Sequence, residues 1–97
     1  MALKGKQIRF LRGLGHHLKP VVMIGKDEIS EQLIFAVQEA LQAHELIKLK
    51  IQEGCLLDRK EVAQILAEKT AAEVVQILGR TILLYQQGEE PQIELPH

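Results

Sequence analysis

The stretch that decides the fold runs Pro20-Val21-Val22-Met23-Ile24-Gly25, four apolar residues between a proline and a glycine. The run is rich in β-branched residues and too short for a helix, so it predicts a strand over 21–24. Because it carries no polar residue on either side, it predicts a strand that is buried on both faces. Amphipathic segments flank it on both sides, which indicates an α/β chain.

The segment before this strand predicts a helix over 4–18 that Pro20 ends. Four apolar residues recur there at spacings of three and four and share one side of the helix, namely Ile8, Leu11, Leu14 and Leu18. The opposite side is basic. Gly13 and Gly15 weaken the helix, so its C-terminal end is expected to be irregular.

The rest of the chain continues the alternation. Ser30 can cap a second helix, over 30–44, and the spacing of Asp58 and Glu61 suits a capping box for a third, over 58–70. Three further strands are predicted. In the first, Ile47, Leu49 and Ile51 alternate with Lys48 and Lys50, which gives one apolar and one basic face; the other two cover 74–78 and 81–85, around a Gly79-Arg80 pair typical of a type II′ turn.

The predicted order is α-β-α-β-α-β-β in one compact domain, residues 1–97, with a core over about 3–86. The two helical crossovers require parallel strands or an intervening strand, so we expect a mixed four-stranded sheet packed with helices. The acidic tail, 87–97, is expected to be loose, although Ile93 and Leu95 could dock on the body.

Charge is divided unevenly along the chain. The first 26 residues contain six Lys and Arg and no Asp or Glu, and the other 71 contain six basic and all 13 acidic residues. Exposed helices usually mix both signs, so an acid-free basic segment indicates a polyanionic partner, of which nucleic acid is the obvious one. The alternative is an adaptor whose basic first helix docks on an acidic protein.

Three blocks of the sequence resemble the signature blocks of the CRM domain, named for chloroplast RNA splicing and ribosome maturation, and its stand-alone bacterial YhbY-like members. They are 11–26 (LRGLGHHLKPVVMIGK), 44–50 (HELIKLK) and 78–85 (LGRTILLY), collinear over about 3–86. The resemblance implies a fold similar to the C-terminal domain of translation initiation factor three. It also implies binding to RNA, specifically 23S rRNA precursors in the pre-50S particle. Many members carry a Gly-x-x-Gly loop, similar to the KH loop that clamps a nucleic-acid backbone; here it reads Gly25-Lys26-Asp27-Glu28.

The candidate RNA-binding residues come from three sources. The acid-free N-terminal segment contributes most of them, the loop after the first strand contributes two, and later basic positions contribute the rest: Lys6, Arg9, Arg12, His16 and Lys19; Gly25 and Lys26; Lys48, Lys50 and Arg80. A lysine on a strand can instead protect a sheet edge, and Gly25 can simply form a turn. With few aromatic and amide side chains placed to read bases, contacts to phosphates should dominate.

No catalytic motif, cofactor fingerprint or metal-ligand spacing is recognisable. Ser30 lies at a helix start, adjacent His16 and His17 point about 100° apart on a helix, and Cys55 has no partner, so we expect no enzyme activity, no cofactor and no metal. Tyr85 could stack on a base, but core packing is the simpler role. No apolar run approaches a membrane span, and we expect a cytoplasmic protein.

Overall fold

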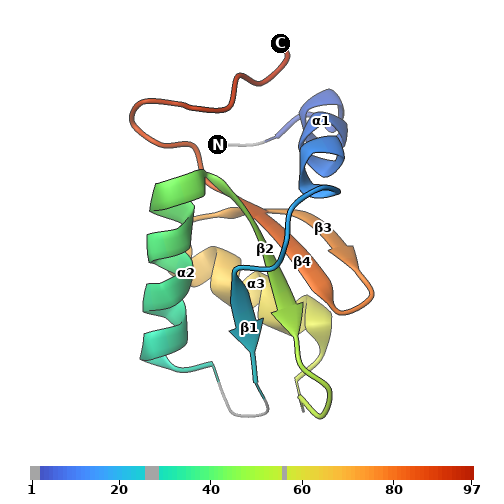
Figure 1. Cartoon of the computed structure of the whole chain (residues 1–97), viewed down its shortest axis with the longest axis vertical. Coiled ribbons are helices and arrows are strands. Elements are labelled where there is room, and N and C mark those ends of the chain that lie inside the picture. Colours follow the sequence, from blue (N-terminus) through green and yellow to red (C-terminus); the bar gives the residue numbers. More distant parts are fainter. Residues whose placement is uncertain (1–2, 26–28, 56) are drawn as a thin grey trace.

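The computed structural model describes residues 3–25, 29–55 and 57–97. Helices and strands alternate in the predicted order (Figure 1). The elements are α1 (Gly5–Gly15), β1 (Val22–Ile24), α2 (Glu31–His44), β2 (Leu46–Ile51), α3 (Arg59–Thr70), β3 (Glu73–Leu78) and β4 (Thr81–Tyr85). The expected α/β class and mixed four-stranded sheet are confirmed.

The strand order in the sheet is β1-β2-β4-β3. β1 is parallel to β2, and β4 is antiparallel to both of its neighbours, β2 and β3. β2 and β3 therefore run in the same direction, are connected through α3, and have β4 between them as the intervening strand. Gly79 has φ +58°, and Arg80 is not among the positive-φ residues, which fits the type II′ turn predicted between β3 and β4.

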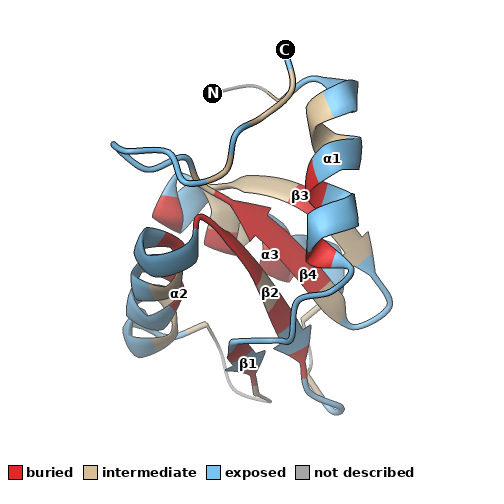
Figure 2. Ribbon diagram, turned by 45° about the horizontal axis from the view of Figure 1, so that its top comes forward, coloured by how far each residue is buried: buried red, intermediate tan, exposed pale blue. Residues whose placement is uncertain are grey.

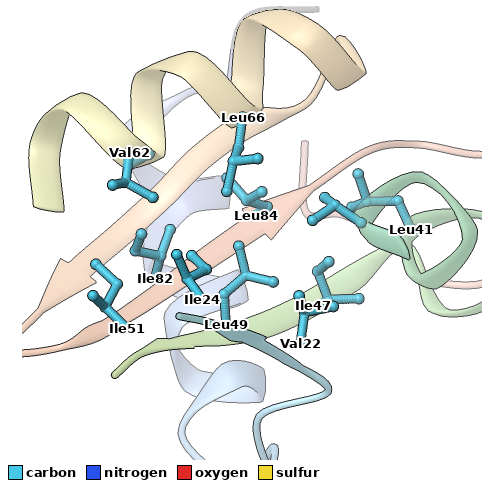
Figure 3. Close-up of a cluster of buried hydrophobic side chains, with 12 residues drawn as sticks. Val22, Ile24, Leu41, Ile47, Leu49, Ile51, Val62, Leu66, Ile82 and Leu84 are labelled. Atoms are coloured by element: carbon cyan, nitrogen blue, oxygen red, sulfur yellow. The ribbon is translucent and has the colours of Figure 1, made fainter. Parts of the chain in front are cut away.

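The two faces of the sheet bury separate cores. One face packs against α2 and α3: Ile47, Leu49, Ile82 and Leu84 meet Val37, Leu41, Val62 and Leu66 (Figure 3). The other face packs against α1, where Leu11 forms one buried cluster with Leu46, Val75, Leu83 and Tyr85. Alternation along β2 and β4 produces this division, because successive side chains of a strand point to opposite faces. The buried residues concentrate along β2 and β4, between the helices (Figure 2).

β1 departs from its prediction. Val22 and Ile24 are buried, but Met23 between them is 49% exposed. The reason is that α1 packs over β2, β3 and β4 and leaves the β1 edge of that face uncovered. The strand is therefore buried on one face only.

The ends of the helices follow the predictions in part. The hydroxyl of Ser30 accepts a hydrogen bond from the Leu33 amide at 3.1 Å, so the predicted cap of α2 is confirmed. Asp58 lies at the N-cap of α3, but its carboxylate makes no capping bond, so the predicted capping box is wrong. α1 ends at Gly15, earlier than predicted, and Leu18 lies beyond the helix.

The C-terminal tail is docked rather than loose, through a buried carboxylate. Glu45 follows α2 with φ +61° and accepts three backbone hydrogen bonds: from Gly88 at 2.6 Å, and from Gln92 and Ile93 at 2.8 Å each. Ile93 and Leu95 pack against the α1 core, as the sequence allowed. The side chain of Gln7 donates to the Pro96 carbonyl at 3.1 Å, which joins the tail to the first turn of α1.

Candidate nucleic-acid interface

Helix α1 presents the predicted basic side chains to solvent. Lys6, Arg9, Arg12 and His16 are all exposed, and the helix and its caps contain no acidic residue. Leu11 and Gly15 fix the opposite side against the sheet: Leu11 is fully buried, and a Cβ on Gly15 would lie 2.5 Å from a terminal methyl of Leu83. The close approach that Gly15 allows therefore holds the helix flat on the sheet with its cations outward.

The two lysines of β2 lie on the face of the sheet that α1 shares. Lys50 is exposed and Lys48 is half-buried. Lys50 pairs in register with Met23 of β1 and with Thr81 of β4. Because β2 lies between β1 and β4, these lysines do not protect a sheet edge, and that alternative is excluded.

Lys19 and Lys48 share a groove beside the end of α1. We call it the α1–β2 groove; it has a volume of about 430 Å³ and is lined by Leu14, Leu18, Lys19, Val21, His44, Leu46, Ile47, Lys48 and Ile93. The segment between α1 and β1 forms one wall and is held by a hydrogen bond from the Val21 amide to the Lys48 carbonyl, at 2.9 Å. The tail contributes Ile93 to another part of the lining.

Gly25 and Arg80 lie at the far end of the sheet from α1. The amide of Ile51 donates to the Arg80 carbonyl, and the next amide, Gln52, donates to the Ile24 carbonyl, both at 2.8 Å. These two bonds place the end of β1 and the β3–β4 turn on either side of the end of β2 (Figure 1). The guanidinium of Arg80 lies 3.9 Å from the carboxylate of Glu53, and both side chains are mostly exposed, so this ion pair is weak.

The structure does not gather all the predicted residues at one point. On α1, Arg12 and Leu14 are two residues apart and therefore point roughly 160° from each other, so Arg12 faces away from the groove that Leu14 lines. The candidates form three regions: the outer side of α1, the α1–β2 groove with the β2 lysines, and the end of the sheet with Gly25 and Arg80. Lys26, with Asp27 and Glu28 of the predicted loop, lies outside the described residues.

Sequence reasoning missed the groove and the role of Glu45. His44, in the last turn of α2, also lines the groove. The sequence shows only that Leu14 and Leu18 extend the apolar stripe of the predicted helix; their exposure, 40% and 37%, is visible only in the structure. No local sequence pattern indicated the role of Glu45, because the amides that it binds lie more than 40 residues away in the sequence.

Burial and hydrogen bonding shift the pKa values of two residues next to the tail, Glu45 and Tyr85. Burial raises the pKa of Glu45, but the three amide hydrogen bonds together outweigh it, so the pKa lies below the ordinary 4.5. Burial and the nearby Glu45 charge raise the pKa of Tyr85. Tyr85 is fully buried in the α1 core, so it packs there rather than offering a stacking platform.

Other kinds of site find little support in the described ranges. Residues 3–25, 29–55 and 57–97 contain no cluster of three His, Cys, Asp or Glu side chains suited to a metal ion. The rings of His16 and His17 make an edge-to-face contact, with centroids 5.5 Å apart. No helix in the described part of the chain is long and apolar enough to cross a membrane.

Comparison with known proteins identifies the family of this chain. Two relatives match along nearly their whole length: "Probable RNA-binding protein YqeI" of Bacillus subtilis, 43% identical over 97% of this chain and 99% of its own, and an "RNA-binding protein" of Haemophilus influenzae, 38% identical over 97% and 95%. The solution structure of Staphylococcus aureus protein SAV1595, described as an RNA-binding candidate, superimposes with a TM-score of 0.82 at 41% identity, covering 98% of this chain and all of that one. The family model for the CRS1/YhbY (CRM) domain matches residues 3–86. The chain therefore belongs to the CRS1/YhbY (CRM) domain family.

Proposed function

We propose that this protein is a cytoplasmic, non-catalytic RNA-binding factor that associates with precursors of the large ribosomal subunit. The observation that carries the proposal is the exposed basic side of α1 without a single acidic neighbour on the helix. Membership of the CRM family and the names of the relatives support RNA as the polyanion. The ribosomal target rests on the CRM resemblance and on no contact in the structure.

Phosphate contacts should dominate this interaction. The exposed cations are lysines and arginines on a helix and a strand, and none is locked against a buried carboxylate among the described ion pairs. Such side chains bind phosphate oxygens without reading sequence. Recognition should then follow the shape and backbone of the RNA rather than a long base sequence.

Sedimentation of cell lysate tests the proposal. At low salt the protein should travel with the large-subunit region of the gradient, and high salt should release it, because screening and counterion competition weaken phosphate contacts. Brief ribonuclease treatment should also move it to the top. An adaptor bound to an acidic protein would share the salt sensitivity but would survive the ribonuclease. Survival of the complex after complete RNA digestion, with no binding of purified RNA at low salt, would overturn the proposal.

A further inference from the structure

The α1–β2 groove is apolar where a soluble protein normally presents polar groups. Three of its lining residues are aliphatic and substantially exposed: Leu14 at 40%, Leu18 at 37% and Val21 at 53%. Single exposed aliphatic residues are common, but a contiguous set around a concavity indicates a binding site. Its volume, about 430 Å³, lies within the range of about 300–1,000 Å³ typical of sites for small organic groups.

The groove combines this apolar lining with cations. Buried Leu46, whose side chain lies on the α1 face of the sheet, contributes to this lining, and the polar lining residues are Lys19, His44 and Lys48. None of the described residues that line it is acidic. An occupant that matches both properties has an apolar body and an anionic group attached to it.

We infer that the α1–β2 groove binds an unstacked base of a single-stranded RNA segment, with the adjoining phosphate held by Lys19 and Lys48. The inference rests on the proposed RNA-binding function and adds to it the class of RNA and the place where a base enters. A nucleotide has the required form, since its base has apolar faces and its phosphate is anionic. Single-stranded loops and ends supply such bases, whereas a duplex keeps them stacked.

The residues that line the groove also determine how well it can distinguish one base from another. Most of the lining is aliphatic, and the Val21 amide already donates to Lys48, so that donor is not free to read a base edge. The groove should therefore accept different bases with little discrimination. Lys50, next on the same face of β2, continues the basic surface away from the groove, which gives the neighbouring phosphates a path.

An amphipathic acidic peptide is the competing occupant, because it too combines apolar groups with negative charge. Nucleic acid is favoured because the groove adjoins the acid-free segment from α1 to β1, a length of positive surface suited to a polyanion. The experiment must therefore distinguish binding of a base from binding of a phosphate, and an RNA occupant from a protein occupant.

The test compares two RNAs of equal length and charge, a ten-residue oligouridine and the same backbone with abasic riboses. The protein should bind oligouridine tighter by roughly fivefold or more, because the base buries apolar surface against the aliphatic lining. In the variant Leu18→Ser with Val21→Ser the two RNAs should bind equally, at the wild-type affinity for abasic RNA. Phe35→Ser with Leu78→Ser is the matched control, because both residues are exposed aliphatic or aromatic positions outside the groove lining, and it should keep the preference.

A measurement on the unaltered protein makes the test independent of variant folding. Uridine 5′-monophosphate should shift the methyl resonances of Leu14, Leu18 and Val21, and ribose 5-phosphate should not. Equal binding of the two RNAs by the wild type, or no methyl shift, would overturn the base site and leave RNA binding intact. Failure to bind either RNA would overturn the proposed function itself. A groove variant that keeps the base preference but loses a ribonuclease-resistant protein partner would assign the groove to a protein.

Discussion

The carboxylate of Glu45 is the main polar contact between the C-terminal tail and the body of the protein, beside the packing of Ile93 and Leu95 and the bond from Gln7 to Pro96. Its two oxygens accept three amide hydrogen bonds, so replacing one oxygen by an NH₂ group must break at least one of them. We expect Glu45→Gln to cost about 1.5–3 kcal/mol of unfolding free energy, the range for hydrogen bonds to charged groups. Faster amide hydrogen exchange at Gly88, Gln92 and Ile93 would locate the loss. Glu94→Gln, on an exposed tail residue, is the control and should change neither quantity.

The same carboxylate gives the tail a pH dependence. The pKa of Glu45 is lowered in the folded protein, from 4.5, so the folded state favours the ionised form. Its contribution to stability is therefore fully present above about 4.5 and is lost as pH falls through the lower folded value. The protection factors of the Gly88 and Gln92 amides, which compare their exchange with the intrinsic rate at the same pH, should fall below pH 4.5 in the wild type. If Glu45→Gln showed the same pH-dependent fall in protection, another group would be responsible.

Two of the glycines in α1 differ in whether their surroundings require glycine. A Cβ on Gly13 would meet nothing within 4 Å, whereas one on Gly15 would crowd buried Leu83 at 2.5 Å. Gly13→Ala should stabilise the protein by about 0.4–1 kcal/mol, because alanine favours the helix and restricts the unfolded chain. Gly15→Ala should destabilise it by about 1–3 kcal/mol through overpacking. Urea denaturation of both variants checks the pair, and equal effects would show that Leu83 moves aside without cost.

At the scale of helices and strands, local pattern predicted most of the fold. Alternation in 46–51, the Ser30 cap and the Gly79-Arg80 turn identified elements that the structure contains. Four predictions failed: the burial of Met23, the end of α1, the Asp58 capping box and the loose tail. The exposure of Met23 and the docking of the tail depend on contacts between residues distant in sequence, which local patterns do not reveal. The strand order was likewise left open, because several pairings satisfy the same local patterns.

The residues of the candidate site could be proposed from the sequence, but their arrangement in space could not. Charge along the sequence identified the cations of α1 and β2, and the structure places all of the described ones at or near the surface. The sequence could not show that His44 and Lys19, from different elements, line the same groove. That relation arises from the packing of α1 and the path of the chain into β1.

Helix α1 carries a direct test of the proposed interface. Arg9→Glu with Arg12→Glu should leave the fold intact, since both side chains are exposed, and should weaken binding to precursor ribosomal RNA strongly. Each lost phosphate contact should also reduce the slope of log affinity against log salt by roughly 0.7–0.9. Lys60→Glu with Lys69→Glu, the same charge change on exposed residues of α3, should have little effect. An unchanged affinity in the first variant with an unchanged circular dichroism spectrum would remove α1 from the interface.

Across the whole molecule, the sheet separates two surfaces of different charge. α1, on one face, carries Lys6, Arg9 and Arg12 without an acid. On the other face, α2 carries Glu31 and Glu39 as its charged side chains, apart from His44, and α3 mixes both signs. A polyanion should therefore approach only from the side of α1, because the opposite side repels it or gains nothing from it.

Lysine footprinting would determine which surface the RNA covers. Bound RNA should protect Lys6, Lys19, Lys48 and Lys50 from amine acetylation, because phosphates or a base would occupy the space around them. Lys60 and Lys69 should keep their reactivity, and because they are exposed on α3 they serve as internal controls in the same sample.

Salt titration gives a second limit: nine of the 12 Lys and Arg lie outside α3, so the salt slope for single-stranded RNA should not exceed roughly 6. Equal protection of Lys60 and Lys69, or a steeper slope, would mean that RNA wraps around both faces, and the one-sided interface would be wrong.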